Sequence, residues 1–538
     1  MTEKVVITVN EGKIRGVKQI SNHSKTPYYA FYGIPYAEQP VHNLRFKDPI
    51  KSKKWANIYD GTKEKLGCSQ ITVVSATECF FWGVEDCLFN NIFTPKLPSE
   101  GEPLRPVIIT IHGGSFFTGS PHSKHYGSPN FIMQHDVVYV CISYRLHILG
   151  FLNLELKECS GNQAFKDVIM SLHWIKENVA SFGGDPENIT LLGCSSGAAT
   201  VHALMLSPAL DRNLFHKAVL MGGYVMNPIA PHSEANKHHG AEIAKLLGYS
   251  GNLDDYSRIL KFLQRKSPEE LLLCLIRYQN SLPKTHAPIT GIGVFSPSID
   301  PHVFPCSPME LIPSMMRIPI LVGYCEREAM LGFTRGEMRK QTEDNFYTSF
   351  CQNCWGWGHD MKTNEINLIK EQIESFYAEG NPIAKASLST KVEIQSDISM
   401  SDIYDTLIDV IAADLPSSVF VFKFEFEGKL ITLKDAGNFE ERISGTYHGS
   451  EYIYWNCFVD SPDDKQTRDM INSFTKLVTT FAKTGDPNNS ELEVRWKPST
   501  LENPCYLSVN NPMQIVEGKV NGERLKFWDN IKKQFSRH

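Results

Sequence analysis

The strongest chemical signal in the chain is a serine held between two glycines at the end of an apolar segment. Residues 189–192 form a short apolar stretch typical of a strand, and residues 193–197 read Gly-Cys-Ser-Ser-Gly. Gly-x-Ser-x-Gly is the pattern of a nucleophile elbow, a sharp strand-to-helix turn that lifts a serine hydroxyl above a sheet. The flanking glycines are needed because the turn is too tight for nearby Cβ atoms. Residues 198–206 follow with helix formers and helix-spaced apolar side chains, so the sequence predicts that Ser195 is a nucleophile.

A serine nucleophile requires partners elsewhere in the chain. Its hydroxyl needs a base, the base needs an acid to orient it, and the developing oxyanion needs backbone N–H donors. The donor candidate is the segment 112–117, His-Gly-Gly-Ser-Phe-Phe, which follows an expected strand at 107–111. Open α/β sheets assemble ligand sites at the carboxyl ends of their strands. A plain turn is the alternative interpretation of this segment, and the 18 histidines of the chain leave the base open at this point.

The elements that must position these residues alternate between strands and helices in the first half of the chain. Continuous β-branched runs at 107–111 and 137–142 are typical of strands buried on both faces. Residues 165–179 have the spacing of an amphipathic helix, and further strands are expected at 189–192 and 218–221. This alternation predicts a mostly parallel sheet with helices on both faces.

The second half is more helical, but strands return there. Residues 318–323 and 419–426 are expected strands, and alternating phenylalanines give the second of these one strongly apolar face. Residues 467–483 and 524–533 have the pattern of closing helices. Residues 5–12 suggest a small N-terminal β-hairpin region before the main sheet.

Length and composition limit the classes of function. The 538 residues contain no internal repeat or charged linker, so we expect a single domain over residues 1–538. The formal net charge of -6 argues against a nucleic-acid partner. The sequence contains no run of about eighteen apolar residues, which is the length needed to span a bilayer. The start, Met-Thr-Glu-Lys, has no apolar core behind a basic segment, so we expect no secretory leader and a cytoplasmic location.

The cysteines suggest neither a metal centre nor a disulfide scaffold. There are 13, an odd number, spread along the chain. Cys351 and Cys354 form a lone Cys-x-x-Cys without a second ligand pair, so we expect no zinc site there. Reduced thiols in the core and in loops are typical of a cytoplasmic protein.

Six further motifs occur in an order that resembles the type-B carboxylesterase family, the cholinesterase and carboxylesterase branch of the α/β-hydrolases. They are 31–37 Phe-Tyr-Gly-Ile-Pro-Tyr-Ala, 44–46 Leu-Arg-Phe, 85–88 Glu-Asp-Cys-Leu, 144–146 Tyr-Arg-Leu, 149–151 Leu-Gly-Phe and 182–186 Phe-Gly-Gly-Asp-Pro. The resemblance covers essentially the whole chain, which looks most like the intracellular insect-type α-esterases. It implies an α/β-hydrolase fold, with a large central, mostly parallel sheet flanked by helices. It also implies hydrolysis of a small-molecule ester without a cofactor or metal.

The resemblance implies the partners of Ser195 as well. The family's acid follows a strand and a glycine at a spacing that selects Glu328 here, with Glu326 as its near competitor. The family's base lies in a Gly-x-x-His-x-x-Glu pattern, matched by residues 445–451, so His448 is the expected base. A surface histidine in a glycine-rich loop is the alternative interpretation of His448. The resulting order of Ser, Glu and His is that of the α/β-hydrolases.

The oxyanion hole implied by the resemblance consists of the backbone N–H groups of Gly114, Ser115 and Ser196. The chain departs from the family here, since Ser115 stands where a third glycine is usual and Ser196 replaces an alanine. A serine at position 115 adds about 1–3 kcal/mol of strain if the backbone there requires a positive φ. Cys194 replaces a common glutamate before the nucleophile, and Gly222 replaces a frequent serine. Together these departures argue against high turnover.

The same resemblance bears on the substrate. The segment between Cys68 and Cys87 resembles the family's first disulfide loop, and the sequence leaves open whether the two cysteines are bonded. Trp82 does not match the placement of the family's choline-stacking tryptophan, and no charge precedes the nucleophile, so little would attract a quaternary ammonium. Phe116 and Phe117 suggest an apolar pocket or, alternatively, core aromatics under the loop. We therefore expect uncharged, lipophilic esters, either xenobiotic or lipid.

Two functions remain in competition. The first is a serine carboxylic ester hydrolase that forms an acyl-enzyme. The second is a catalytically weak or silent family member that binds ligands or protein partners, or sequesters ligands through slow acylation. Silent relatives typically lose the nucleophile, whereas this chain keeps Ser195, Glu328 and His448.

Overall fold

The computed structural model describes residues 3–73, 79–225, 236–282, 293–334, 362–398, 408–413, 418–430, 443–459, 462–490, 492 and 495–535. Cys351 and Cys354 lie outside the described residues. In the part of the chain that is described, no helix combines the length and the apolar character that a membrane span requires.

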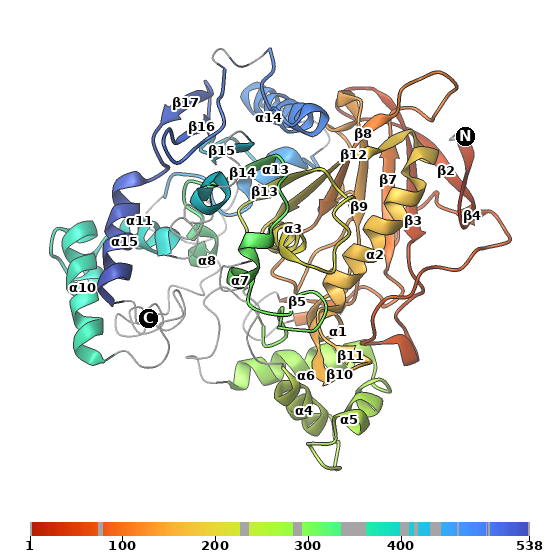
Figure 1. Cartoon of the computed structure of the whole chain (residues 1–538), viewed down its shortest axis with the longest axis horizontal. Coiled ribbons are helices and arrows are strands. Elements are labelled where there is room, and N and C mark those ends of the chain that lie inside the picture. The colour runs from red at the N-terminus through yellow and green to blue at the C-terminus, as the bar shows by residue number, and fades with distance from the viewer. Residues whose placement is uncertain are drawn as a thin grey trace.

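One large mixed sheet of 13 strands organises the molecule (Figure 1). The strands follow one another in space as β1 (Lys4–Val9), β2 (Gly12–Ile20), β3 (Pro27–Pro35), β7 (Phe89–Thr94), β9 (Val138–Ile142), β8 (Arg105–Ile111), β12 (Gly184–Cys194), β13 (Lys217–Met221), β14 (Ile320–Cys325), β15 (Val419–Phe424), β16 (Cys505–Val509) and β17 (Gln514–Glu517). Beside this path, β4 (Tyr59–Asp60) pairs with β2.

The central strands of this sheet are parallel, and the pairs at its two ends are antiparallel. From β9 to β16 every neighbouring pair is parallel. The strands from β1 to β9 at one end, and β16 with β17 at the other, pair antiparallel. The prediction of a mostly parallel sheet is therefore confirmed, and the carboxyl ends of its parallel strands meet at one edge.

The N-terminal hairpin is present, with Val9 opposite Gly12, but it forms an edge of the main sheet. The sequence did not predict β3 and β7, which join this hairpin to β9. Neither strand reads as a continuous apolar run, because β3 contains Gly33 and ends at Pro35, and β7 contains Asn90 and Asn91.

The two faces of the sheet bury different side chains because successive residues of a strand point to opposite faces. In β15, Val419 and Val421 enter one core, and Phe420 and Phe422 enter the other. The predicted phenylalanine face of this strand is confirmed.

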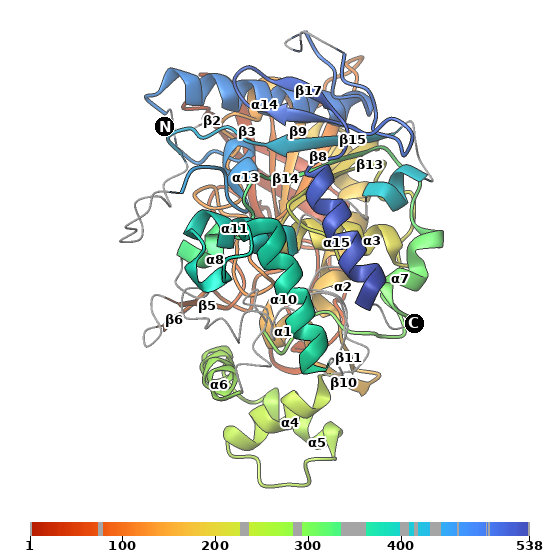
Figure 2. The ribbon, with the colours of Figure 1, turned by 90° about the vertical axis from the view of Figure 1, so that its left-hand side faces the viewer.

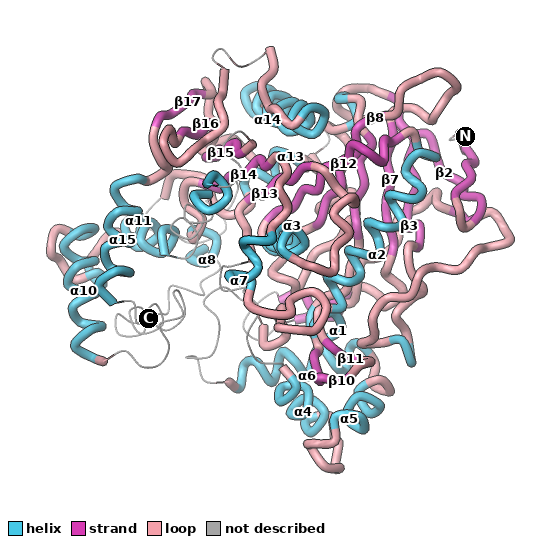
Figure 3. The backbone as a smooth tube through the Cα atoms, viewed as in Figure 1, coloured by secondary structure: helices cyan, strands magenta, loops and turns pink. Residues whose placement is uncertain are grey.

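Helices cover both faces, as expected from the alternation of elements (Figure 3). Helices α2 (Gln163–Asn178) and α3 (Ser196–Leu206) bury apolar side chains in the first core. Helices α13 (Ser450–Trp455) and α14 (Lys465–Thr484) do so in the second. The helices predicted at 165–179 and 467–483 are thus found within a few residues of their expected bounds.

Two further groups of helices lie outside the central layers. Helices α4 (Lys237–Leu246), α5 (Tyr256–Leu263) and α6 (Pro268–Ser281) lie together at the bottom of both ribbon views (Figures 1 and 2). Helices α10 (Thr363–Ala378), α11 (Leu388–Ser396) and α15 (Gly522–Phe535) share a small core of isoleucines with Trp528. The helix predicted at 524–533 is α15.

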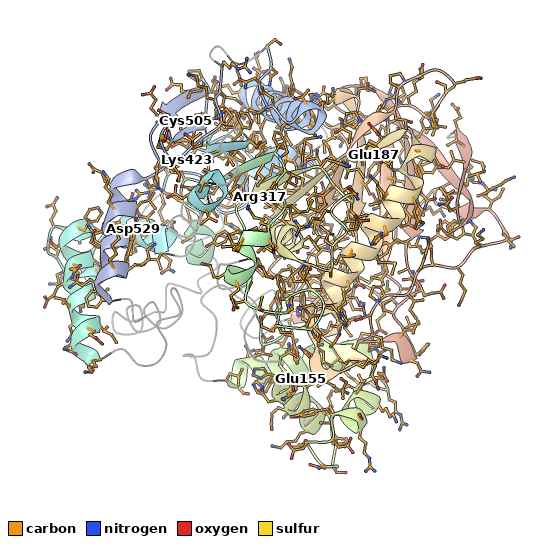
Figure 4. All side chains as sticks on the ribbon, viewed as in Figure 1. Glu155, Glu187, Arg317, Lys423, Cys505 and Asp529 are labelled. Atoms are coloured by element: carbon orange, nitrogen blue, oxygen red, sulfur yellow. A yellow bond between two sulfur atoms is a disulfide. The ribbon has the colours of Figure 1, made fainter. Side chains whose placement is uncertain are left out.

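Short elements complete the fold. They are α1 (His147–Phe151), α7 (Pro308–Leu311), α8 (Met330–Thr334), the paired strands β5 (Gln70–Val73) and β6 (Cys79–Trp82), the paired strands β10 (Asn153–Leu156) and β11 (Cys159–Ser160), and 3-10 turns at His42–Leu44, Met133–His135, Val179–Phe182, Ile312–Ser314 and Ile383–Lys385. Side chains fill the space between the sheet and its helices (Figure 4). The side chains of Glu187 and Asp529 are largely exposed.

Candidate active site

Ser195 occupies the sharp turn between β12 and α3, with φ 58° and ψ -128°. A Cβ added to Gly193 would lie 2.2 Å from the carbonyl carbon of Gly197, and one added to Gly197 would lie 2.2 Å from the carbonyl oxygen of Ile111. Both contacts are too short for a side chain, so both glycines of the motif are required. The N–H of Ser195 donates to the carbonyl of Met221 over 2.8 Å, which fixes the turn at the end of β13.

The structure brings His448 and Glu328 to Ser195. His448 Nε2 lies 2.7 Å from Ser195 Oγ, and His448 Nδ1 lies 2.5 Å from Glu328 Oε2. The Glu328 side chain is fully buried, and its Oε1 accepts the N–H of Cys325 over 2.7 Å. The three side chains therefore form one hydrogen-bonded line in which a carboxylate orients an imidazole toward a serine hydroxyl.

The loops that carry His448 and Glu328 are bonded to each other. The N–H of Arg327 donates to the carbonyl of Thr446 over 2.9 Å, and the N–H of Glu326 donates to the Thr446 hydroxyl over 3.1 Å. These bonds join the segment after β14 to the segment before α13. In this arrangement Glu328, and not its competitor Glu326, reaches the imidazole.

The glycine-rich loop after β8 lies directly against the elbow. A Cβ on Gly113 would lie 2.6 Å from the carbonyl oxygen of Cys194 and 3.0 Å from the Cβ of Ser195. The next two residues have positive φ, 116° at Gly114 and 55° at Ser115. Ser115 thus has the positive φ at which a serine is expected to be strained.

Three N–H groups beside Ser195 are available to a ligand. In the described part of the chain, the backbone N–H groups of Gly114, Ser115 and Ser196 donate to no other residue. Ser196 is the first residue of α3, where N–H groups lack intrahelical partners and carry the positive end of the helix dipole. Because Gly113 lies against the elbow and Ser196 directly follows Ser195, these N–H groups belong to segments next to the nucleophile.

A model of the carboxylesterase family matches residues 3–528. The chain belongs to the carboxylesterase family. It is a carboxylic ester hydrolase, and the family implies a small-molecule ester as its substrate.

Relatives of this esterase come from several animals. It is 29% identical to Esterase FE4 of Myzus persicae over 514 residues, which cover 93% of this chain and 88% of that one. It is 25% identical to Esterase B1 of Culex pipiens, with 98% of both chains covered. Both are named as esterases.

A solved structure supports the fold. The juvenile hormone esterase of Manduca sexta, solved with OTFP covalently attached, superposes with a TM-score of 0.80 at 24% identity and covers 99% of this chain. The predicted α/β-hydrolase fold is confirmed.

A second buried carboxyl group, Glu451, lies beside the His448–Glu328 pair. Burial and the nearby negative charge of Glu328 raise the pKa of Glu451 to about 7. The Cys325 thiol donates to Glu451 Oε2 over 2.6 Å, while Oε1 accepts no hydrogen bond from the described residues. The sequence marked Glu451 only as the last position of the histidine motif, and it carried no signal for the Cys325 contact.

Gly222 leaves open the space between these groups. A Cβ at this position would lie 3.0 Å from Glu451 Oε1, 3.3 Å from His448 Nδ1 and 3.4 Å from Glu328 Oε1. Its φ of 56° is left-handed, which suits glycine. The serine that the family often has here would therefore place its side chain among the three groups, and this esterase lacks it.

Cys325, Glu328 and Glu451 also have the composition of a metal site. One ligand atom from each lies within 4.8 Å of the others. The carboxylate of Glu328, however, already accepts hydrogen bonds from His448 and from the Cys325 N–H, and the Cys325 thiol donates to Glu451. We therefore interpret the group as a hydrogen-bonded support for His448.

Cys194, the residue before the nucleophile, is a neutral group. Burial raises the pKa of its thiol well above the usual value, and the charges of Glu451 and Glu328 act in the same direction. The position where the family commonly has a glutamate therefore carries no charge in this esterase.

The loop after β8, residues 112–117, is called the oxyanion loop below, and its two phenylalanines have different environments. Phe116 is fully buried, with its ring 4.9 Å from that of Phe151 and 5.8 Å from that of Phe165. The core interpretation is therefore right for Phe116, and the pocket interpretation is wrong. Phe117 is half-buried and packs edge-on against the ring of His147 at 4.4 Å.

Cys68 and Cys87 form a disulfide, with Cα atoms 5.0 Å apart. Strands β5 and β6 lie inside the loop that this bond closes. Trp82, at the end of β6, packs against His125 with a centroid distance of 6.1 Å.

Proposed function

We propose that this esterase hydrolyses uncharged, lipophilic carboxylic esters through an acyl-enzyme formed on Ser195. The observation that carries the proposal is the line from Ser195 Oγ to His448 to Glu328, beside the three backbone N–H groups of the oxyanion loop and the elbow. A nucleophile, a base with its orienting acid, and backbone N–H donors are the kinds of group that acyl transfer uses, and this supports the proposal.

In the acylation step, Ser195 Oγ attacks the ester carbonyl while His448 Nε2 takes its proton. Glu328 holds the proton on His448 Nδ1 and stabilises the imidazolium that forms. The electron pair of the carbonyl double bond moves to the oxygen, which gives a tetrahedral intermediate. When this intermediate collapses, the bond to the alcohol oxygen breaks, and the alcohol leaves with the proton from His448.

The developing oxyanion is placed against the N–H groups of Gly114, Ser115 and Ser196. Such donors are typically worth about 10²–10³ in kcat each, because they are fixed before the charge appears. In the second step His448 activates a water molecule, which attacks the acyl-enzyme and releases the acid.

The uncharged substrate class is supported by the electrostatics of the elbow. Because the thiol of Cys194 is neutral, that position offers no negative charge to a quaternary ammonium. Lipid esters and xenobiotic esters both fit this proposal, and a role in detoxification would follow from the second. The cytoplasmic location also stays a prediction, to be checked by cell fractionation.

The alternative function is slow acylation that sequesters a ligand. The left-handed φ of Ser115 favours it, because a strained serine stands where the oxyanion must be held. A burst of one product equivalent followed by negligible turnover would support this alternative over hydrolysis.

The test is hydrolysis of p-nitrophenyl and naphthyl esters by the wild type and by Ser195→Ala. We expect the substitution to lower kcat/KM by at least about 10⁴-fold, because it removes the nucleophile. Ser171→Ala is the matched control, since Ser171 is a buried serine on α2 whose hydroxyl donates to Asn90 over 2.7 Å. Wild-type protein that neither hydrolyses these esters nor reacts with a fluorophosphonate probe would contradict the proposed function.

A further inference from the structure

The oxyanion loop contains three consecutive residues with positive φ. The angles are 116° at Gly114, 55° at Ser115 and 62° at Phe116. A residue with a Cβ is strained in this region, so Ser115 and Phe116 both oppose the conformation. A strained segment of this kind persists only when surrounding contacts impose it.

Phe116 is the residue through which those contacts act. Its N–H donates to the hydroxyl of Ser196 over 3.3 Å, and its carbonyl accepts the N–H of His147 over 2.9 Å. Phe116 and Ser196 are both fully buried, so water cannot replace the hydroxyl as a partner. The Phe116 ring is fixed in the core as well, between Phe151 and Phe165.

Tyr144 holds the beginning of the loop. Its hydroxyl donates to the carbonyl of His112 over 2.7 Å, and the rings of Tyr144 and His112 stack at 4.4 Å. The Ser196 hydroxyl holds the loop further along, at Phe116.

We propose that the side chain of Ser196 is a positioning group for the oxyanion hole, an inference that rests on the proposed function. The backbone of Ser196 supplies one N–H donor, and its hydroxyl holds the loop that supplies the other two. An alanine here keeps the backbone donor but leaves the buried N–H of Phe116 unpaired. The loop then loses the contact that opposes its strain, and the donors at Gly114 and Ser115 shift from the oxyanion.

The first experiment compares Ser196→Ala with Thr200→Val, each normalised to the active serines counted by fluorophosphonate titration. Thr200 is a fully buried residue on the same helix, and its hydroxyl donates to the carbonyl of Ser196 over 2.9 Å. We expect Ser196→Ala to lower kcat about 10- to 30-fold with little change in KM. This decrease in kcat is smaller than the one expected when a whole oxyanion donor is removed. Thr200→Val should stay within about twofold of the wild type.

A trifluoromethyl ketone provides a readout that a general structural defect would not move. Ser195 Oγ adds to its carbonyl, the proton passes to His448, and the carbonyl electron pair becomes an oxyanion in the hole. We expect Ser196→Ala to raise the inhibition constant of this ketone by the same factor by which it lowers kcat/KM. The two factors should agree because the bound ketone and the transition state both place an oxyanion in the hole. Ser196→Cys, which keeps a weaker acceptor, should give an intermediate loss.

The second experiment is a double-mutant cycle with Ser115→Gly. Because glycine adopts a positive φ without strain, the loop should depend less on Ser196 in that background. We expect the loss caused by Ser196→Ala to be at least about threefold smaller there than with Ser115 present.

The outcomes separate the two proposals. A wild type that fails to hydrolyse esters or to react with the probe overturns the proposed function itself. A fully active wild type with Ser196→Ala within about twofold of it, or no worse than Thr200→Val, overturns only the positioning role. If Ser196→Ala causes the same loss with and without Ser115→Gly, the hydroxyl does not act through the strained loop, and the proposal is overturned in that form.

Discussion

Two buried glutamates lie next to His448, and their contacts give them different states. Glu328 accepts hydrogen bonds from His448 and from the Cys325 N–H, whereas Glu451 accepts one from the Cys325 thiol. Two carboxylates so close in a buried site do not both ionise easily, so one of them keeps a proton. Burial and the charge of Glu328 raise the pKa of Glu451, so we expect Glu451 to be the group that keeps the proton below neutral pH.

This state predicts how the stability of the esterase depends on pH. The pKa of Glu451 is about 7 in the fold and 4.5 in an unfolded chain. Between these values the folded state holds a proton that the unfolded state has lost, so the contribution of Glu451 to stability falls as pH rises. Glu451→Gln cannot titrate. Its thermal midpoint minus that of the wild type should therefore increase from pH 5 to pH 7.5.

The matched control for this prediction is Glu502→Gln, which removes a carboxylate from an exposed position. Its midpoint difference from the wild type should stay nearly constant over the same range. Parallel pH profiles for Glu451→Gln and the wild type would contradict the assignment of the proton to Glu451.

At the scale of elements, a buried ion pair joins the segment after β9 to helix α2. Arg145 Nη2 and Nε donate to the two oxygens of Asp167 over 2.6 Å and 2.7 Å, and Arg145 Nη1 donates to the carbonyl of Lys47 over 2.7 Å. Burial raises the pKa of Asp167 although Arg145 opposes the shift. Removing one partner would therefore leave a buried charge without compensation.

We expect Asp167→Ala to lower the free energy of unfolding by about 3–5 kcal/mol, the cost typical of breaking such a pair. Asp469→Ala is the control, because Asp469 pairs with Lys465 on α14 over 2.5 Å with both side chains largely exposed. That substitution should cost under about 0.5 kcal/mol. Denaturant titration of both variants measures the difference, and similar costs for the two would contradict the argument.

At the scale of the whole molecule, the Cys68–Cys87 bond bears on where the protein works. Disulfides persist mainly in oxidising compartments, so the bond depends on the compartment in which the protein folds. The bond closes a loop with a sequence separation of 19. A disulfide that closes a loop of this length raises the free energy of unfolding by roughly 3 kcal/mol.

We expect a reducing agent to lower the thermal midpoint of the wild type and to leave that of Cys68→Ser/Cys87→Ser unchanged. The reduced wild type and the double variant should have similar midpoints, because both lack the same crosslink. Thiol counting with an alkylating reagent on protein isolated from its own cells reports whether the bond is present there. Equal sensitivity of both proteins to the reducing agent would contradict a stabilising role for this bond.

Much of the scaffold could be predicted from local sequence. The parallel strands β8, β9, β12, β13, β14 and β15 read as apolar runs, and α2 and α14 read as amphipathic helices, because burial on defined faces imposes these patterns. The antiparallel strands β3 and β7 were missed, because glycine, proline and asparagine interrupt their apolar residues. The environment of Phe116 was also open, because an apolar side chain after a loop suits a pocket or a core equally well.

By itself the sequence determined the family, the sharp turn at Ser195 and the identities of the residues that fill each motif. Only the tertiary structure decided which groups touch, since Ser195 and His448 are 253 residues apart and His448 and Glu328 are 120 apart. They meet because parallel strands end at one edge of the sheet. The contact between Cys325 and Glu451, and the one between Ser196 and Phe116, likewise depend on packing. Hydrogen bonds and burial depend on which residues are neighbours in space, and spacing along the chain does not specify those neighbours.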